Sequence, residues 1–443
     1  MNLSSEDIIG WVAAKCEALG ADDYSIQLFY NDEGQARFSN GSLTITNRLL
    51  NKEVDVYIAK GRKRILGSLS SMKKESVTAF VEHLFSSLTA GGAESDFPRL
   101  PAGPFSYSYN GDFDPQVDHF DLAGNAAIAI EAAEEAGAKR VAGSLSTNHV
   151  RLWIRTSTGV DRSEERSRFL LNVRSFTDRD ASGHGLSVST TVKGFDPEGA
   201  GRVSGEGSKS CRHPREVEVG DYTVIFNPTV AADIVQRVGQ SASAFGVDAG
   251  LSFLANQLGK TVAAEDFTLI DHGQIVNGVG SRSFDDEGVP TRSNVLIDRG
   301  VLKTYVHNST TAAKQKAELT GNAGLIEPHV WNLEVAPGDY TLEEMIRETK
   351  KGIYVTNNWY TRFQSYATGE YSTLPRDAAW LIEGGELKHP VAGIRISGEI
   401  PRQLKSIDAL GKERNWVKWW EVEVPTLAPA LRIPNVRVTK ASG

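Results

Sequence analysis

Three acidic residues stand side by side in the middle of the chain, Asp285, Asp286 and Glu287. Carboxylates grouped in this way can bind a divalent cation or the amine of a substrate. They can equally organise a turn, because aspartate side chains accept hydrogen bonds from neighbouring backbone amides. The cluster lacks the spaced oxygen ligands of a calcium loop. A structural role in a turn is therefore the favoured interpretation, and a ligand site is the alternative.

The residues that follow the acids predict a hairpin. Gly288 and Pro290 indicate a turn, and an apolar strand follows at residues 295–297. The Asp-Arg-Gly sequence at 298–300 is typical of a hairpin turn, and residues 301–306 form the return strand. His307 and Asn308 come directly after it. A histidine here can serve a site, although a hydrogen-bonded histidine at a strand end is the commoner outcome.

A second group of notable residues lies near the end of the chain, where three tryptophans fall within five positions: Trp416, Trp419 and Trp420. Large aromatic side chains are usually buried in a core. Tryptophan is also enriched at the centres of protein interfaces. The sequence leaves both interpretations open.

The composition is that of an acidic globular protein. The chain has 443 residues, enough for two or three domains, and a formal net charge of −8. Nucleic-acid binding requires a clustered basic face, so we expect no nucleic-acid partner. Two cysteines are too few for a disulfide framework or a cysteine zinc site. Since the start of the chain lacks a signal-peptide pattern and no apolar run reaches the ~18 residues that span a bilayer, we expect a soluble, cytoplasmic protein without membrane contact.

Hydrophobic periodicity divides the chain into three regions. In residues 1–90 a helix that begins with the capping-box pattern Ser4 to Asp7 precedes four strands and a second helix, which predicts a small helix-flanked antiparallel sheet. In residues 91–218 a linker precedes a helix at 121–138, several strands, and a loose glycine-rich segment at 199–214. Residues 219–443 begin with a strand and a helical region at 229–258. Strands and hairpins then follow, together with a turn at 271–273 and a short helix at 342–349. The predicted fold class is α+β, with a larger strand-rich C-terminal domain.

Several motifs in a fixed order resemble the TldD/PmbA family. The hairpin after the acids resembles the family signature, and the resemblance is strongest over residues 222–412. Further matching segments are Arg-Phe-Ser-Asn-Gly at 37–41, Thr-Gly-Asn-Ala at 320–323, Pro-Gly-Asp-Tyr-Thr-Leu-Glu-Glu at 337–344, Thr-Gly-Glu-Tyr-Ser at 368–372 and Trp-Leu-Ile-Glu-Gly-Gly-Glu-Leu at 380–387. The resemblance implies that the C-terminal sheet curls around a helix.

The resemblance also bears on metal binding, because the TldD branch carries a His-Glu-x-x-x-His helix and a C-terminal cysteine that bind zinc. The helix that aligns with it here places Asp233 and Val238 at the histidine positions and Ile234 at the glutamate. The cysteine is absent as well. The chain therefore resembles the PmbA branch, also called TldE, with no catalytic residue, metal or cofactor of its own. The resemblance implies a TldD-like partner whose zinc activates water, and a shared channel that admits small or unfolded peptides.

Three hypotheses follow. The first is a non-catalytic subunit of a heteromeric zinc metallopeptidase, in which the residues of the acidic hairpin and the tryptophan group line the peptide channel or the interface. The second is a homomeric peptide-binding protein that needs no catalytic partner. The third is an enzyme with a non-metal site built from carboxylates such as Asp285 and Glu287.

Overall fold

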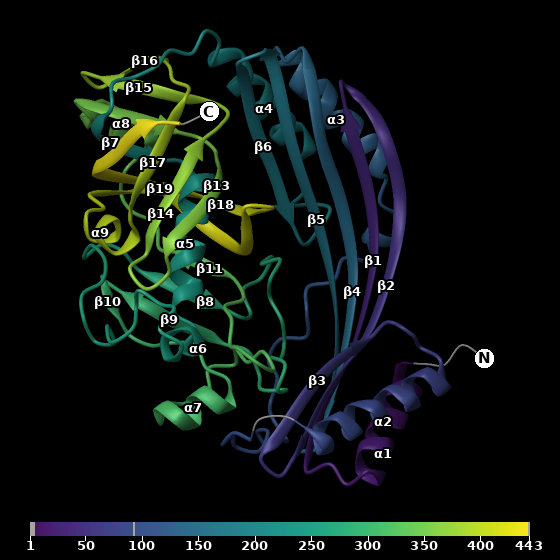
Figure 1. Ribbon diagram of the computed structural model, residues 1–443. Coiled ribbons are helices and arrows are strands. Elements are labelled where there is room, and N and C mark those ends of the chain that lie inside the picture. The colour runs from purple at the N-terminus through teal and green to yellow at the C-terminus, as the bar shows by residue number, and fades with distance from the viewer. Residues whose placement is uncertain (1–4, 92–93, 442–443) are drawn as a thin grey trace.

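The computed structural model describes residues 5–91 and 94–441, which form two β-sheets (Figure 1). The predicted cap residue Ser4 lies outside the described residues. One sheet has six strands and forms a long, curved wall along one side of the molecule. The other has 13 strands and forms the body of the C-terminal half.

The wall is an antiparallel sheet with the strand order β3-β2-β1-β4-β5-β6. Its strands are long: β1 pairs with β4 from Ser25 to Phe38 without a break. The sequence pattern predicted shorter, separate strands. The strand continues through the polar middle of β1 because its backbone groups are hydrogen-bonded on both sides, to β2 and to β4. The strands are β1 (Asp23–Ser39), β2 (Ser42–Lys60), β3 (Lys63–Leu69), β4 (Arg140–Thr156), β5 (Asp161–Asp178) and β6 (Ala181–Ser189).

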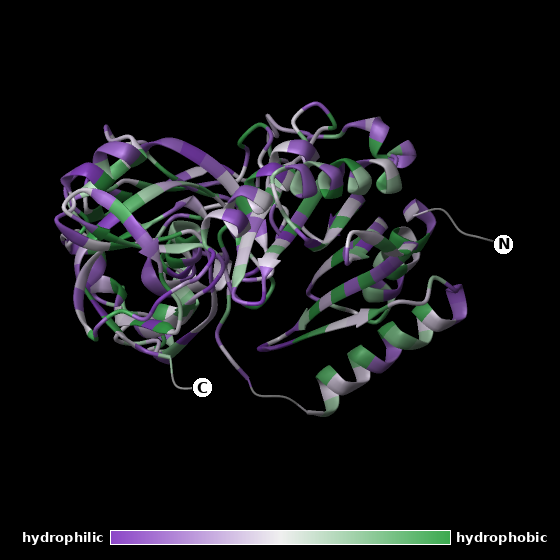
Figure 2. Cartoon of the chain, turned by 90° about the horizontal axis from the view of Figure 1, so that it is seen from above, coloured by the Kyte–Doolittle hydropathy of each residue, from purple (hydrophilic) through white to green (hydrophobic). Residues whose placement is uncertain are grey.

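Strands β1 to β3 come from the predicted region 1–90, and β4 to β6 come from the predicted region 91–218. One sheet therefore joins these two regions. Burial alternates along its strands, and Figure 2 shows hydrophobic and hydrophilic residues alternating in the same way. One face carries helices that bury two apolar clusters against the strands. These helices are α1 (Ser5–Ala18), α2 (Lys74–Ala90), α3 (Leu122–Glu135) and α4 (Pro197–Ser210), and a short 3-10 helix, η1 (Pro115–His119), precedes α3.

Helix α4 corrects the sequence prediction of a loose segment at 199–214. Its glycines have low intrinsic helix propensity, which is why the segment resembles a loop. The Asp196 side chain caps its first turn by accepting a hydrogen bond from Gly199 N at 2.8 Å. The glycines allow α4 to approach α3 and β6 closely: a Cβ on Gly201 would lie 2.2 Å from the Ala129 carbonyl oxygen. Tertiary packing therefore stabilises a helix that local propensity disfavours.

The second sheet surrounds the helix α5 (Pro228–Ser241), which is buried on nearly all sides. This agrees with the expected α+β architecture, in which a curled sheet packs around a helix. The helical region ends earlier than predicted, with the short helix α6 (Ala244–Asp248), and the expected turn at 271–273 begins inside a strand, β8. The strands are β7 (Gly220–Phe226), β8 (Leu269–His272), β9 (Ser293–Asp298), β10 (Val301–Leu302), β11 (Leu333–Val335), β12 (Lys351–Val355), β13 (Asn358–Ser365), β14 (Glu370–Pro375), β15 (Ala379–Glu383), β16 (Glu386–Pro390), β17 (Ile394–Glu399), β18 (Ala409–Trp419) and β19 (Val422–Lys440).

Three short helices complete this half: α7 (Ser309–Gln315), α8 (Leu342–Glu348) and α9 (Ile400–Lys405). The predicted cap of α8 is present, because Thr341 and Glu344 exchange side-chain and backbone hydrogen bonds. Across the described ranges, no helix has both the length and the apolar character needed to cross a membrane.

We expect Gly201→Ala to destabilise the protein. Alanine would favour an exposed helix by about 1 kcal/mol, but its methyl group would clash with the Ala129 carbonyl oxygen. We expect a net loss of about 1–3 kcal/mol in the free energy of unfolding, measured with denaturant. Gly246→Ala in α6 is the control, since nothing lies within 4 Å of its Cβ position. Equal stability of the two variants would contradict this account of α4.

Candidate functional site

Asp285 organises the turn that follows Phe284. Its side chain is 1% exposed, and one carboxylate oxygen accepts hydrogen bonds from Glu287 N at 3.0 Å and Val289 N at 2.9 Å. The other oxygen accepts a hydrogen bond from Ala323 N at 2.9 Å. Both oxygens are thus bound to backbone amides of the chain itself. This geometry supports the structural interpretation of the acidic cluster.

Glu287 connects the turn to helix α7. Its carboxylate accepts hydrogen bonds from Ser309 Oγ at 2.7 Å and Ser309 N at 3.0 Å. Asn308 caps the same helix, since its side chain accepts a hydrogen bond from Thr311 N at 2.9 Å. His307 Nδ1 lies 3.3 Å from Thr311 Oγ1, and burial lowers the pKa of this histidine. The structure therefore brings Glu287, His307 and Asn308 together, at the start of a helix that they stabilise.

Burial is the main electrostatic influence on the two enclosed acids. It raises the pKa of Glu287 to about 7, against the opposing effect of the hydrogen bonds from Ser309. Burial also raises the pKa of Asp285, and the neighbouring charge of Glu287 raises it further. Both carboxylates therefore bind a proton more readily than they would in water.

Asp286 differs from its neighbours because it faces the wall. Its carbonyl oxygen accepts hydrogen bonds from Ser25 Oγ at 3.1 Å and Gln27 Nε2 at 3.2 Å, both on β1. Its carboxylate forms an ion pair with Arg282 at 3.0 Å. The turn at residues 283–289 is consequently a place where the two sheets are joined.

The three tryptophans have different environments. Trp419 is 8% exposed and its ring lies 4.7 Å from that of His184 on β6, which fits the core interpretation. Trp416 is half-buried on β18. Trp420 is 60% exposed and lies beside Trp359, whose ring centroid is 6.5 Å away. With Tyr360, which is 50% exposed, Trp359 and Trp420 form an exposed aromatic patch that suits the interface interpretation.

Helix α5 contains the residues that align with the zinc motif of the TldD branch. Asp233 is fully buried, and one of its oxygens accepts hydrogen bonds from Asn358 Nδ2 at 2.8 Å and Thr361 Oγ1 at 2.6 Å. The other oxygen accepts a hydrogen bond from Gln236 Nε2 at 2.9 Å. Ile234 and Val238 pack in the apolar core.

These residues do not fit a zinc ion. Zinc sites in proteins use imidazole, thiolate and free carboxylate ligands, whereas both oxygens of Asp233 are already hydrogen-bonded to protein donors. Within residues 5–91 and 94–441, no three His, Cys, Asp or Glu side chains gather in a way that could hold a metal ion. No catalytic step is therefore assigned to a metal on this chain.

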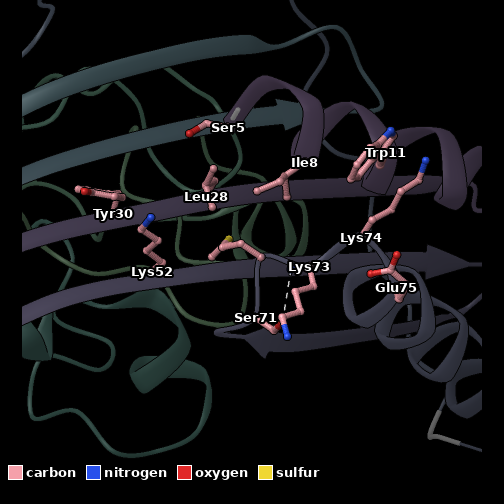
Figure 3. Close-up of a pocket in the computed structure, with 11 residues that line it drawn as sticks. Ser5, Ile8, Trp11, Leu28, Tyr30, Lys52, Ser71, Lys73, Lys74 and Glu75 are labelled. Atoms are coloured by element: carbon pink, nitrogen blue, oxygen red, sulfur yellow. Dashed lines mark hydrogen bonds between the residues drawn. The ribbon is translucent and has the colours of Figure 1, made fainter. Parts of the chain in front are cut away.

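Two cavities involve residues of the wall. One, of about 680 Å³, lies between α1, α2 and the helix-covered face of β1 and β2 (Figure 3). Its wall includes Ile8, Trp11 and Leu28, and three lysines lie around it, Lys52, Lys73 and Lys74. None of the residues singled out in the sequence lines it.

The other cavity, of about 280 Å³, lies between β5 of the wall and the C-terminal half. Four cationic side chains line it, Arg166, Arg168, Arg282 and Lys418. The sequence analysis missed this group. A partial signal was present, since Arg166 and Arg168 are two positions apart on a strand and therefore share a face.

Two domain models of one metallopeptidase family match this chain. Residues 115–211 match the PmbA/TldA metallopeptidase central domain, and residues 219–440 match the C-terminal domain of the same family. The chain belongs to the PmbA/TldD metallopeptidase family.

Individual relatives agree with this assignment. A metalloprotease of Methanocaldococcus jannaschii is 36% identical over 204 residues, 44% of each chain. Metalloprotease PmbA of Escherichia coli O157:H7 is 30% identical over 218 residues, 49% of this chain and 47% of that one. The chain thus spans about half the length of the curated relatives it matches. The crystal structure of TldE from Thermococcus kodakarensis has the same fold, with a TM-score of 0.85 over 98% of this chain and 99% of that one, at 19% identity.

We expect the buried Glu287 to make stability depend on pH. Its pKa in the folded state, about 7, lies above the ordinary value of 4.5. Folding therefore favours the protonated form, and this contribution is present below pH 4.5 and lost as the pH rises through 7. Relative to wild type, Glu287→Gln should gain about 1–3 kcal/mol in unfolding free energy between pH 5 and pH 8. A constant difference at all pH values, measured by denaturant unfolding, would rule this out.

We expect Asp233→Ala to be strongly destabilising. The substitution leaves the buried donors of Asn358 and Thr361 without this acceptor. The expected loss is about 3–5 kcal/mol in unfolding free energy. Asp233→Asn is the matched comparison, because it retains one acceptor oxygen and should lose less. If the alanine variant unfolds at the same denaturant concentration as wild type, the network is not a stabilising element.

Proposed function

We propose that this chain is the non-catalytic subunit of a TldD/TldE-type zinc metallopeptidase that trims or degrades small or unfolded peptides. The observation that carries the proposal is the hydrogen-bonded state of Asp233 on α5. In the position where the TldD branch has a zinc ligand, this chain has a buried acid whose oxygens are occupied by amide, hydroxyl and guanidinium donors. The family membership supplies the peptidase context.

The aromatic patch of Trp359, Tyr360 and Trp420 is the surface that we assign to the catalytic partner. Glu421 holds the patch in place, since its carboxylate accepts a hydrogen bond from Tyr360 N at 2.7 Å. The Glu421 carbonyl oxygen in turn accepts a hydrogen bond from Gln236 of α5. The buried network that replaces the zinc ligands is thus continuous with the exposed patch. Exposed tryptophan and tyrosine rings are typical centres of protein interfaces.

The other two hypotheses have less support. A non-metal site at Asp285 and Glu287 would need carboxylate oxygens that face a substrate, but these oxygens bind backbone amides and Ser309. A homomeric peptide-binding protein is compatible with the fold. It differs from the proposed heteromer in its partner, which would be a second copy of this chain and not a zinc subunit.

We expect the tagged chain, purified from its native host, to retain a second chain that carries a His-Glu-x-x-x-His motif. The isolated chain should contain less than stoichiometric zinc by elemental mass spectrometry and should not cleave peptides, whereas the complex should contain zinc and cleave them. Recovery of the chain alone as a homomer would support the peptide-binding alternative. Zinc binding and cleavage by the isolated chain would overturn the proposal.

We expect Trp420→Ala to weaken this association by about tenfold or more, as is typical for the loss of a central interface tryptophan. Its side chain is 60% exposed, so the stability of the isolated chain should change little. Leu387→Ala on β16, which removes another exposed apolar side chain, is the control. Equal capture of the partner by both variants would remove the aromatic patch from the interface.

A further inference from the structure

The cavity between β5 and the C-terminal half is rich in positive charge. Figure 1 shows β18 reaching the wall beside β5 and β6, and the cavity of about 280 Å³ lies at this junction. Two of its cations, Arg166 and Arg168, project from β5. The other two, Arg282 and Lys418, come from the segment before the acidic turn and from β18.

Two of the four cations have carboxylate partners. The Nε of Arg166 lies 3.3 Å from the buried carboxylate of Glu164, and its Nη1 donates a hydrogen bond to the Ser281 carbonyl oxygen at 3.1 Å. Arg282 pairs with Asp286 at 3.0 Å. Glu164 is itself shared, because it accepts hydrogen bonds at 2.6 Å from both Ser283 N and Ser283 Oγ.

The other two cations lack such partners. Among the described residues, no carboxylate oxygen lies within 4.0 Å of the charged nitrogens of Arg168 or Lys418, although Glu423 also lines the cavity. Lys418 Nζ donates a hydrogen bond at 2.6 Å to the backbone carbonyl of Glu423. The Nε of Arg168 and one terminal nitrogen of Arg282 are buried without a hydrogen-bond partner, whereas the Nε atoms of Arg166 and Arg282 lie 3.3 and 4.0 Å from Glu164 Oε1.

This arrangement is electrostatically incomplete. Arg168 and Lys418 are half-buried without a counter-charge, and cations that lose hydration without one are costly. Burial, together with the neighbouring cations, lowers the pKa of Arg166 and of Arg168, and it lowers the pKa of Lys418 to about 8. An anion that enters the cavity would accept the free donors and remove the mutual repulsion. Guanidinium groups match the two oxygens of a carboxylate particularly well.

Apart from His329 and Glu423, the remaining side chains that line the cavity are apolar, which indicates an organic anion. Arg282 stacks over the Trp331 ring with its guanidinium carbon 4.6 Å from the ring centroid. A cavity of this size is below the usual range of about 300–1,000 Å³ for drug-sized ligands, so it suits one end of a chain. The apolar lining residues are Leu170, Val279, Val330, Trp331, Val424 and Pro425.

We propose that the cavity lined by Arg166, Arg168, Arg282 and Lys418 binds the C-terminal carboxylate of a peptide, with the last apolar side chain against Trp331 and its neighbours. The choice of a peptide as the ligand rests on the proposed function. Within the proposed peptidase, the task of this chain would be to hold the free C-terminal end of the peptide.

Calorimetric titration of the full-length chain without a partner tests the inference. The probes are the tripeptide Gly-Ala-Leu with a free carboxylate, its C-terminal amide, and Gly-Ala-Glu amide, which carries its only carboxylate on a side chain. We expect the free acid to bind about tenfold or more tightly than either amide. Equal binding of Gly-Ala-Leu and its amide would overturn the inference. Binding of Gly-Ala-Glu amide as tightly as the free acid would also overturn it, because the cavity would then recognise acidic side chains.

Substitutions of Arg168 and Lys418 locate the binding. Arg168→Gln and Lys418→Gln should each weaken binding of the free acid about tenfold, and Arg168→Lys should retain part of it. Because the two glutamine variants remove an unpaired charge, their thermal midpoints should equal or exceed that of wild type, which separates lost binding from lost folding. Arg179→Gln, at the exposed β5–β6 turn, is the control. Unchanged binding in both glutamine variants would overturn the inference.

The outcome is independent of partner capture. Carboxylate-dependent binding by a chain that captures no zinc subunit would overturn the heteromeric function and leave the cavity assignment in place. Capture of that subunit without any discrimination between acid and amide would overturn the cavity assignment alone.

Discussion

The turn at residues 283–289 is a main joint between the two sheets. Ser283 donates two hydrogen bonds to the buried Glu164 of β5, and the Asp286 carbonyl oxygen accepts two from β1. Tyr107 adds a third link, since its hydroxyl donates to the Gly288 carbonyl oxygen at 2.7 Å. Asp285 keeps the turn in the shape that these contacts require. The acids that first suggest chemistry thus position the wall against the C-terminal half.

Buried polar groups differ in whether the chain itself supplies their partners. A buried polar group is stable only when it is hydrogen-bonded, because desolvation is otherwise uncompensated. Asp233, Asp285 and Glu287 satisfy this rule with donors of the chain itself. Arg168 and Lys418 differ, since no carboxylate of the described residues pairs with them and Lys418 donates only to the backbone carbonyl of Glu423. The contrast separates residues that hold the fold from residues that remain available to a ligand.

Much of the local structure could be predicted from the sequence, because the deciding interactions lie within a few residues. The cap of α8 by Thr341 and Glu344 and the hairpin between β9 and β10 are of this kind. Predictions failed where packing overrides local preference. Helix α4 forms in a glycine-rich segment because its glycines permit close contact with α3, while Gly183 and Gly185 let β6 approach its backbone. The buried face of α5 was recognisable, but the donors that occupy Asp233 come from β13, more than a hundred residues further on.

By itself the sequence determined the family, the α+β class and the absence of the zinc motif from α5, since these depend on residue types in a fixed order. Only the tertiary structure decided how the functional candidates are used. It tied Asp285 and Glu287 to backbone amides, separated buried Trp419 from exposed Trp420, and gathered four cations around one cavity. The physical reason is that proximity between β5, the acidic turn and β18 follows from sheet order and from the joint between the sheets, which no local pattern encodes.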